Sequence, residues 1–547
     1  MSAVPQTGDR ASPLATATFA GLLVVAGVFL MHQTRGNTLL SDEWRWAVER
    51  LDNDVGTFLT PHNDHLSLVP VAIYKVLFAT VGIGNYVPYR LLVTAGHLGC
   101  VALLFAYASR RVGGWLALLA AALMLFLGPG WQNMLWPFQI AWLISIGAGI
   151  GALLLLDRDN RAGDVAASAL IAVSLASSGI GVPIALGMIV EVLWARRRPR
   201  DIWIVLAPLA LYAVWWVGYQ EVHSTLGETI TAWPGWSAAL AAGTLSSLTG
   251  LFGQTVPGRG GGTLIEWGAP LVVGAVALLA WRIARLGRFP PRALTLLTVL
   301  MSFWILTALD RAAFAPPYES RYLYVSALFV VLVAVELARG VSLAPRVRWL
   351  LTLAVAAAVL SNIGGLRAAA AYQRGQSRLV TADLGALQLA RPLVHRGVLA
   401  TGFPGYPLFQ LDAGAYLEAE KVLGAPAATA EADIAAKPER ARLTADVQLL
   451  QVQQMTLRPA ARRPQDREAC VTGRDELSVP VPWAGLWVAA HGSPATLAIR
   501  RFADGYQRLG ALAAAAPATL RLQRDLAARP WQLRVVAPDG ATVCRLR

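Results

Sequence analysis

The stretch that decides the fold is residues 14–46, LATATFAGLLVVAGVFLMHQTRGNTLLSDEWRW. It begins with an apolar run, Leu14–Met31, that is long enough for a helix to cross a bilayer. No small-residue cleavage site precedes the polar segment that follows, so we expect a retained membrane span and not a cleaved signal peptide. That polar segment contains the acidic pair Asp42-Glu43 beside Trp44 and Trp46.

The composition indicates a membrane protein with a globular tail. The chain has 547 residues, a mean hydropathy of +0.50 and only 15% charged residues. Apolar blocks of about twenty residues end near Leu366, and a mixed composition follows. We therefore expect a transmembrane domain at 1–365, an extracytoplasmic helical or mixed connector at 366–469, and an extracytoplasmic module at 470–547.

Hydropathy predicts about eleven membrane spans. We place them at 13–32, 88–109, 114–129, 135–156, 163–177, 180–195, 201–219, 268–286, 292–309, 321–338 and 347–365. Two further apolar segments, 66–82 and 236–252, are interpreted as interfacial or re-entrant helices, because counting 236–252 as a crossing would reverse the orientation of the later loops.

The arginines predict the orientation. The net charge of +14 comes largely from arginines in short loops around 110–111, 158–161, 196–200, 282–292 and 339–348, and so does not indicate nucleic-acid binding. The opposite loops carry fewer basic residues over a greater length. The positive-inside rule therefore predicts a cytoplasmic N-terminus and an extracytoplasmic tail. The near absence of lysine favours a bacterial source, hence a multi-pass protein of the bacterial cytoplasmic (inner) membrane.

The tail is expected to be of α+β type. Short alternating apolar stretches follow Cys470, and turns such as Pro538-Asp539-Gly540 separate them, which predicts a small β-sandwich. Cys470 and Cys544 flank this module at its first and last strands. On an oxidising outer face we expect them to form a disulfide; the alternative is two unpaired thiols.

The acidic pair Asp42 and Glu43 is the candidate catalytic element. A carboxylate shielded by tryptophans can serve as general base toward a sugar hydroxyl, or can bind a divalent cation. Adjacent helical residues face different directions, so we expect one of the two in the site and the other in a structural role. The competing interpretation is that Asp42 only caps a helix at 43–51.

Three further outer segments offer candidate substrate-binding residues. The segment around His62, Asn63, Asp64 and His65 could line a donor or acceptor site, or could merely cap the following helix. The other two segments could bind sugar hydroxyls and a lipid-linked phosphate, or could form an ordinary interfacial belt and anchor. Their candidate residues are Gln132, Asn133, Trp136 and Gln139 in one, and Arg321, Tyr322 and Tyr324 in the other.

This arrangement resembles the GT-C superfamily of polytopic membrane glycosyltransferases. The resemblance covers roughly residues 13–365 and lies in the order of the elements and in five local motifs. These are Asp42-Glu43-Trp44, His62-Asn63-Asp64-His65, the segment Asn133–Gln139, Ser177-Ser178-Gly179-Ile180-Gly181 and Ser320-Arg321-Tyr322-Leu323-Tyr324. It implies a GT-C-like bundle that transfers a sugar from a polyprenyl-phosphate donor on the outer face, with Asp42 as base, Glu43 as its possible substitute and Arg321 against the donor phosphate.

The implied partners are a polyprenyl-phospho-sugar donor and a glycan, lipid or protein acceptor of the cell envelope. No cofactor is certain, and the sequence leaves a divalent metal possible without naming its ligands. Two other functions stay open: a lipid or polysaccharide transporter or flippase, and a non-catalytic envelope protein that binds polysaccharide. The predicted spans carry few ionisable residues, His97 being the clearest, which disfavours ion-coupled transport.

Overall fold

The protein consists of two compact units, each built from segments distant in sequence. The computed structural model describes residues 12–196, 198–219, 229–251, 262–395, 397–400, 411–424, 431–453, 455–460 and 470–546. The first unit contains the chain up to Arg35 together with residues 52–77 and 87–373, and the second contains residues 36–51, 78–86 and 374 onward. The division of the sequence at 365 and 469 remains a prediction, and residues 461–469 lie outside the described part.

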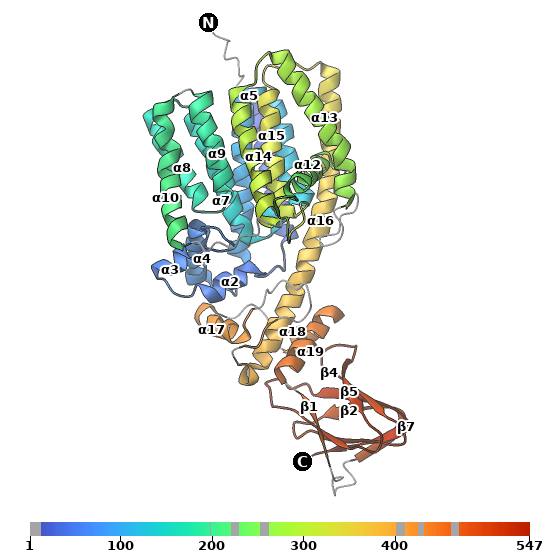
Figure 1. Cartoon of the computed structure of the whole chain (residues 1–547). Helices are drawn as coiled ribbons and strands as arrows, with labels where there is room; N and C mark the ends of the chain where they lie inside the picture. Colours follow the sequence, from blue (N-terminus) through green and yellow to red (C-terminus); the bar gives the residue numbers. More distant parts are fainter. Residues whose placement is uncertain are drawn as a thin grey trace. The chain divides into compact units, whose positions relative to one another are not determined.

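The first unit is a helical bundle (Figure 1). Its helices, in chain order, are α1 (Pro13–Gln33), α3 (Val55–Leu59), α4 (Leu68–Val81), α5 (Val87–Leu125), α6 (Gln132–Leu135), α7 (Ile140–Leu156), α8 (Arg161–Leu175), α9 (Gly181–Val190), α10 (Trp203–Tyr219), α12 (Trp233–Thr249), α13 (Gly262–Leu286), α14 (Pro291–Arg311), α15 (Ser320–Leu337) and α16 (Pro345–Leu389). Helix α4 ends within the second unit, and α16 continues into it.

Eight of the described helices are long and apolar enough to cross a membrane. The predicted polytopic helical fold is therefore confirmed, although the count of eleven spans is not. Each predicted span nevertheless coincides with a helix of this unit. Helix α5 accounts for two of them, because Gly113 has a φ of +81° and interrupts its helical geometry. Only glycine adopts that conformation without strain, so the chain can turn back there.

An ion network joins five helices at one end of the bundle. Arg111 pairs with Glu336 and with Asp157, the latter at 3.0 Å. Arg292 contacts Asp157 at 3.1 Å and Glu191 at 2.6 Å. These groups come from the break in α5 near Gly113 and from the ends of α7, α9, α14 and α15 that the arginine pattern assigns to a single face. Paired in this way, the carboxylates and guanidiniums avoid the large cost of an isolated buried charge.

The opposite ends of these helices also meet one another. The Arg311 guanidinium donates to the carbonyl of Asn63 at 3.1 Å, and the backbone N–H of Gln132 donates to Ser320 Oγ at 2.9 Å. Helix α12 has both ends on this side: Trp236 donates to the carbonyl of Ala315, while Ser361 donates to that of Gly250. These contacts agree with the expectation that α12 enters and leaves on the same face.

Within its described residues, the second unit contains four α-helices of its own and a β-sheet. The helices are α2 (Asp42–Glu49), α17 (Ala413–Leu423), α18 (Glu431–Ala435) and α19 (Glu439–Gln453), beside the end of α16. The strands are β1 (Thr456–Pro459), β2 (Cys470–Val481), β3 (Leu486–Ala490), β4 (Ala495–Arg500), β5 (Gln507–Leu512), β6 (Ala518–Arg521) and β7 (Trp531–Arg545). They form one seven-stranded sheet in the order β1-β6-β3-β7-β4-β5, with β2 also paired to β7. A C-terminal sheet region is thus present as predicted; the strands, expected as a small β-sandwich, are all hydrogen-bonded into this one sheet, because the long strand β7 pairs with β2, β3 and β4.

Carboxylates on α18 and α19 fix these helices to loops of the sheet. Asp446 accepts from the backbone N–H groups of residues 501–503, at 2.8 to 3.1 Å. Glu439 accepts from residues 504–505, and Glu431 from residues 528–529. Charge-assisted bonds of this kind are stronger than neutral ones. The helical connector and the sheet are therefore joined through backbone groups as well as side chains.

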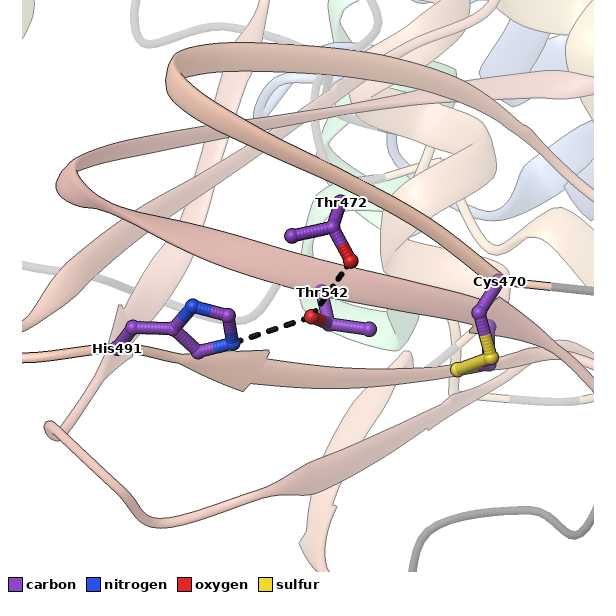
Figure 2. Close-up of a disulfide and its surroundings, with 5 residues drawn as sticks. Cys470, Thr472, His491 and Thr542 are labelled. Atoms are coloured by element: carbon purple, nitrogen blue, oxygen red, sulfur yellow. Dashed lines mark hydrogen bonds between the residues drawn. A yellow bond between two sulfur atoms is a disulfide. The ribbon is translucent and has the colours of Figure 1, made fainter. Parts of the chain in front are cut away.

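A disulfide lies within this sheet (Figure 2). Cys470 on β2 is directly opposite Cys544 on β7, and their sulfur atoms are 2.06 Å apart. Two residues further along β2, Thr472 Oγ1 lies 2.9 Å from Thr542 Oγ1, which in turn lies 3.1 Å from His491 Nε2. The remaining cysteine, Cys100, is buried in α5 and is a free thiol.

Candidate functional site

The His62–His65 segment forms a tight hairpin turn in the first unit. The N–H of His62 donates to the carbonyl of His65 at 3.0 Å, and the reverse bond measures 3.1 Å. The two central residues, Asn63 and Asp64, have φ values of +50° and +66°. Two left-handed residues in succession define a type I′ turn, which Asn and Asp tolerate better than most side chains do. The turn, and not a helix cap, thus explains this pair of residue types.

His65 packs against the glycine of the Ser177-Ser178-Gly179 motif. A Cβ atom at Gly179 would lie 2.7 Å from the Nδ1 atom of His65, so no larger residue fits without a shift. Burial, and then the nearby Arg311 guanidinium, lower the pKa of His65 to about 4. The imidazole is therefore neutral near pH 7, and it can donate one hydrogen bond and accept another.

Arg311 is a residue that the sequence analysis did not single out for the site. It ends α14, donates to the carbonyl of Asn63 and forms an ion pair with Asp310 at 2.7 Å. It was visible in the sequence only as one of the few basic residues of the outer loops. Its contact with the hairpin turn joins residues 248 positions apart, which no local pattern reveals.

Arg321 begins α15, close to the Gln132 segment. Its guanidinium pairs with Glu319 at 3.4 Å and lies 5.3 Å from the centre of the Tyr322 ring. Its backbone N–H donates to Gln132 Oε1 at 3.3 Å. Gln132 therefore links the two outer segments through Ser320 and Arg321.

Tyr322 lies among aromatic rings and near both arginines. Its ring centre is 5.9 Å from that of Trp142 and 5.6 Å from that of Trp236. Arg321 and Arg311 both interact electrostatically with its hydroxyl group. Neither Trp142 nor Trp236 was predicted as a site residue, because tryptophans near span ends are ordinary interfacial anchors in sequence terms.

The remaining predicted residues of this unit are more deeply placed. Tyr324 is fully buried, and its hydroxyl oxygen lies 2.8 Å from Nδ1 of His97. The side chain therefore forms a hydrogen bond in the interior of the bundle. The ring centre of Trp136 lies 5.1 Å from that of Phe138 in a tilted arrangement, and the Phe138 ring is 5.4 Å from that of His62. In the described part of the chain, no hydrogen-bond partner is found for the buried side-chain amides of Asn133 and Gln139.

Asp42 and Glu43 belong to the second unit. Helix α2 starts at Asp42, and the preceding Ser41 has a φ of +49°, a conformation that costs a non-glycine residue energy and is concentrated at functional sites. Glu43 is fully buried and accepts from the Leu40 N–H at 3.0 Å and from the Tyr86 hydroxyl. Asp42 is also largely buried, at 7% exposure. Asp42 is thus the first residue of the helix and not its cap.

No group of three or more His, Cys, Asp or Glu side chains suited to a metal ion is found in the described residues.

Comparison with known proteins gives structural similarity only. No family model and no curated protein matches the sequence. Among solved structures, ArnT from Cupriavidus metallidurans bound to undecaprenyl phosphate is 15% identical with a TM-score of 0.44, over 76% of this chain and 90% of that one. The archaeal oligosaccharyltransferase AglB from Archaeoglobus fulgidus, in complex with an inhibitory peptide and a dolichol-phosphate, is 15% identical with a TM-score of 0.43, over 77% of this chain and 61% of that one.

The match to the arabinosyltransferase EmbB from Mycobacterium smegmatis spans 99% of this chain and 66% of the EmbB chain, at 11% identity and a TM-score of 0.32. Two of these names describe glycosyl-transferring enzymes, the class that the sequence motifs resemble.

Proposed function

We propose that the protein is a glycosyltransferase of the bacterial cytoplasmic membrane. It transfers a sugar from a polyprenyl-phosphate-linked donor to a cell-envelope acceptor on the outer face, with the N-terminus in the cytoplasm and the tail outside. The observation that carries this proposal is the group at one end of the bundle. There, the Arg321 guanidinium lies 5.3 Å from the centre of the Tyr322 ring, Trp142 and Trp236 flank that ring, and the charge of Arg311 also acts on the Tyr322 hydroxyl.

The group suits a lipid-linked sugar phosphate. The donor phosphate leaves with negative charge, and guanidinium groups stabilise that charge as it develops. Aromatic rings offer flat apolar faces to a sugar. The apolar helices α10 and α13 expose large side chains such as Leu211, Val217 and Val273, as expected where a bundle meets the acyl chains of lipids.

Asp42 is proposed as the general base. The acceptor hydroxyl must lose a proton as it attacks the sugar, so a carboxylate has to lie within hydrogen-bond reach. Glu43 is engaged by Leu40 and Tyr86, which favours a structural role for it and leaves Asp42 as the better candidate. The strained backbone at Ser41 supports this assignment, because folds retain such strain where function requires it.

The neutral His65 and the amide groups of Gln132, Asn133 and Gln139 are proposed to contact the sugar or the phosphate. Neutral donors and acceptors match sugar hydroxyls, which are themselves neutral. The hairpin turn that carries His65 also contains His62, Asn63 and Asp64. Trp136 and Tyr324 are proposed to support this turn from within the bundle.

The test is turnover of radiolabelled polyprenyl-phospho-sugars by the full-length protein in proteoliposomes. We expect label to leave the lipid and polyprenyl phosphate to appear, in amounts that match the transferred sugar. Movement of intact lipid-linked sugar between leaflets without cleavage would identify a flippase instead. Saturable binding of polysaccharide with neither cleavage nor movement would identify a binding protein.

A further inference from the structure

Helix α17 of the tail contacts two separate parts of the loop region that follows the first span. The second unit contains residues 36–51, here named the first polar loop, together with residues 78–86 and the tail. The first polar loop carries Asp42. Its contacts with the tail begin at Thr38, whose N–H donates to Ser377 Oγ on α16 at 3.3 Å.

A second contact joins Trp44 to Tyr416. Both side chains are fully buried, and their rings meet edge to face at 5.4 Å with an interplanar angle of 80°. Each ring is also held at its polar end: Trp44 Nε1 donates to the carbonyl of Leu39 at 2.9 Å, and Gln388 donates to the Tyr416 hydroxyl at 2.8 Å. Aromatic pairs of this geometry contribute energy beyond the area that they bury.

The other end of α17 holds residues 82–83. The N–H of Ile83 donates to the carbonyl of Leu423 at 3.1 Å. A Cβ atom at Gly82 would lie 2.3 Å from the same carbonyl oxygen, so this approach requires glycine. Residues 78–86 in turn hold the first polar loop, because Tyr86 donates to Glu43.

We propose that α17 is a clamp that positions Asp42, and that Tyr416 is its principal positioning residue. The ring of Tyr416 packs against Trp44, which lies two residues after Asp42 on α2. Leu423 holds residues 82–83, and Tyr86 of the same segment donates to Glu43. This proposal rests on the proposed function for its catalytic consequence. It assigns the tail a direct part in the reaction, since a base displaced by about 1 Å can cost on the order of 10²-fold in rate.

The experiment compares Tyr416→Ala with Tyr416→Phe in the full-length protein, with Tyr506→Ala as control. Tyr506 lies in the same tail but contacts Arg500 and Arg534 of the sheet. Two quantities are measured: hydrogen–deuterium exchange of peptides that cover residues 36–51, and kcat and KM for the donor. Exchange reports local opening whether or not the protein is an enzyme.

Tyr416→Ala is expected to speed exchange in the first polar loop and to lower kcat on the order of 10-fold or more with an unchanged donor KM. Tyr416→Phe keeps the ring and should show wild-type exchange and wild-type kcat. Tyr506→Ala should leave the exchange rate and kcat unchanged. Wild-type exchange and kcat in Tyr416→Ala would overturn the clamp. A wild-type protein that never cleaves the donor would overturn the proposed function instead, and the exchange measurement would still decide the clamp.

Discussion

The hydroxyl of Tyr86 donates to the carboxylate of Glu43, at 3.0 and 2.8 Å from its two oxygen atoms. The backbone N–H of Leu40 donates to the same carboxylate, and the whole side chain is buried. A carboxylate that two such donors engage holds the loop together. We therefore propose that Glu43 has a structural role and that Asp42 is the base, and mutations should separate the two.

Glu43→Gln is expected to destabilise the protein by about 1–3 kcal/mol, because an amide N–H₂ group then faces a buried donor. The measurement is the thermal midpoint of the detergent-solubilised protein. Glu49→Gln is the matched control, since the pair of Glu49 with Arg45 is half-exposed and its loss should change stability little. A Glu43→Gln variant that is as stable as wild type but inactive would make Glu43 the base.

Asp383 predicts an unusual pH dependence of stability. Helix α16 has 45 residues, about 68 Å, against a hydrocarbon core of about 30 Å, so Asp383 lies well beyond the apolar segment near 347–365. Its side chain is fully buried, and neither carboxylate oxygen has a hydrogen-bond partner in the described part of the chain. Burial raises the pKa of Asp383 to about 8.

The raised pKa makes Asp383 destabilising at neutral pH. The unfolded chain ionises this carboxyl above about pH 4, whereas the folded protein keeps it protonated up to about pH 8. Its contribution to stability should therefore fall as pH rises from about 4 to 8. Asp383→Asn should remove this slope and stabilise the protein at pH 7 by on the order of 4 kcal/mol.

The measurement for Asp383 is the thermal midpoint at several pH values between 5 and 8.5. The control variant is Asp475→Asn, at an exposed position whose φ of +62° asparagine tolerates. Parallel pH profiles for wild type and Asp383→Asn would show that the Asp383 carboxyl titrates normally.

Arg321 is expected to distinguish donor binding from simple anchoring. A guanidinium meets two phosphate oxygens at once, while an ammonium is a point charge. Arg321→Lys should weaken apparent donor affinity, and Arg321→Ala should weaken it further, by about 10-fold or more. Arg346→Ala, an exposed substitution at the start of α16, should not change it. Equal donor affinities in all four proteins would remove Arg321 from the site.

The Cys470–Cys544 disulfide is expected to stabilise the tail and to report its compartment. It closes a loop of 74 residues, which in the chain-entropy model corresponds to about 4 kcal/mol. Neither thiol should react with maleimide in intact cells until a reductant is added. Labelling of both cysteines without reduction would contradict both the bridge and the extracytoplasmic location of the tail.

The sequence predicted the elements better than their contacts. Apolar length located the long helices of the first unit, and the alternation after Cys470 located most of the strands, whereas α17, α18, α19 and β5 were not predicted. The last span, 347–365, and the connector from residue 366 were expected as separate parts, yet α16 runs across that boundary from Pro345 to Leu389 as one helix. Whether a helix continues or ends at such a boundary depends on the residues there, which a single sequence shows.

The site depended on contacts between distant residues. The sequence required one of Asp42 and Glu43 to be structural, but only the position of Tyr86 indicates which. Likewise, the contact of Arg311 with Asn63 and that of His65 with Gly179 join different helices, and no periodicity predicts them. Trp142 and Trp236 were missed for the same reason.

The most direct test of the central claim is the transfer rate of Asp42→Asn relative to wild type. The full-length proteins are reconstituted at equal amounts with a radiolabelled polyprenyl-phospho-sugar. Asparagine keeps the size of aspartate and removes its basicity, so the variant should fold, bind the donor normally and transfer sugar about 10²-fold more slowly or worse. Transfer by Asp42→Asn at a near wild-type rate would contradict the assignment of Asp42 as the general base.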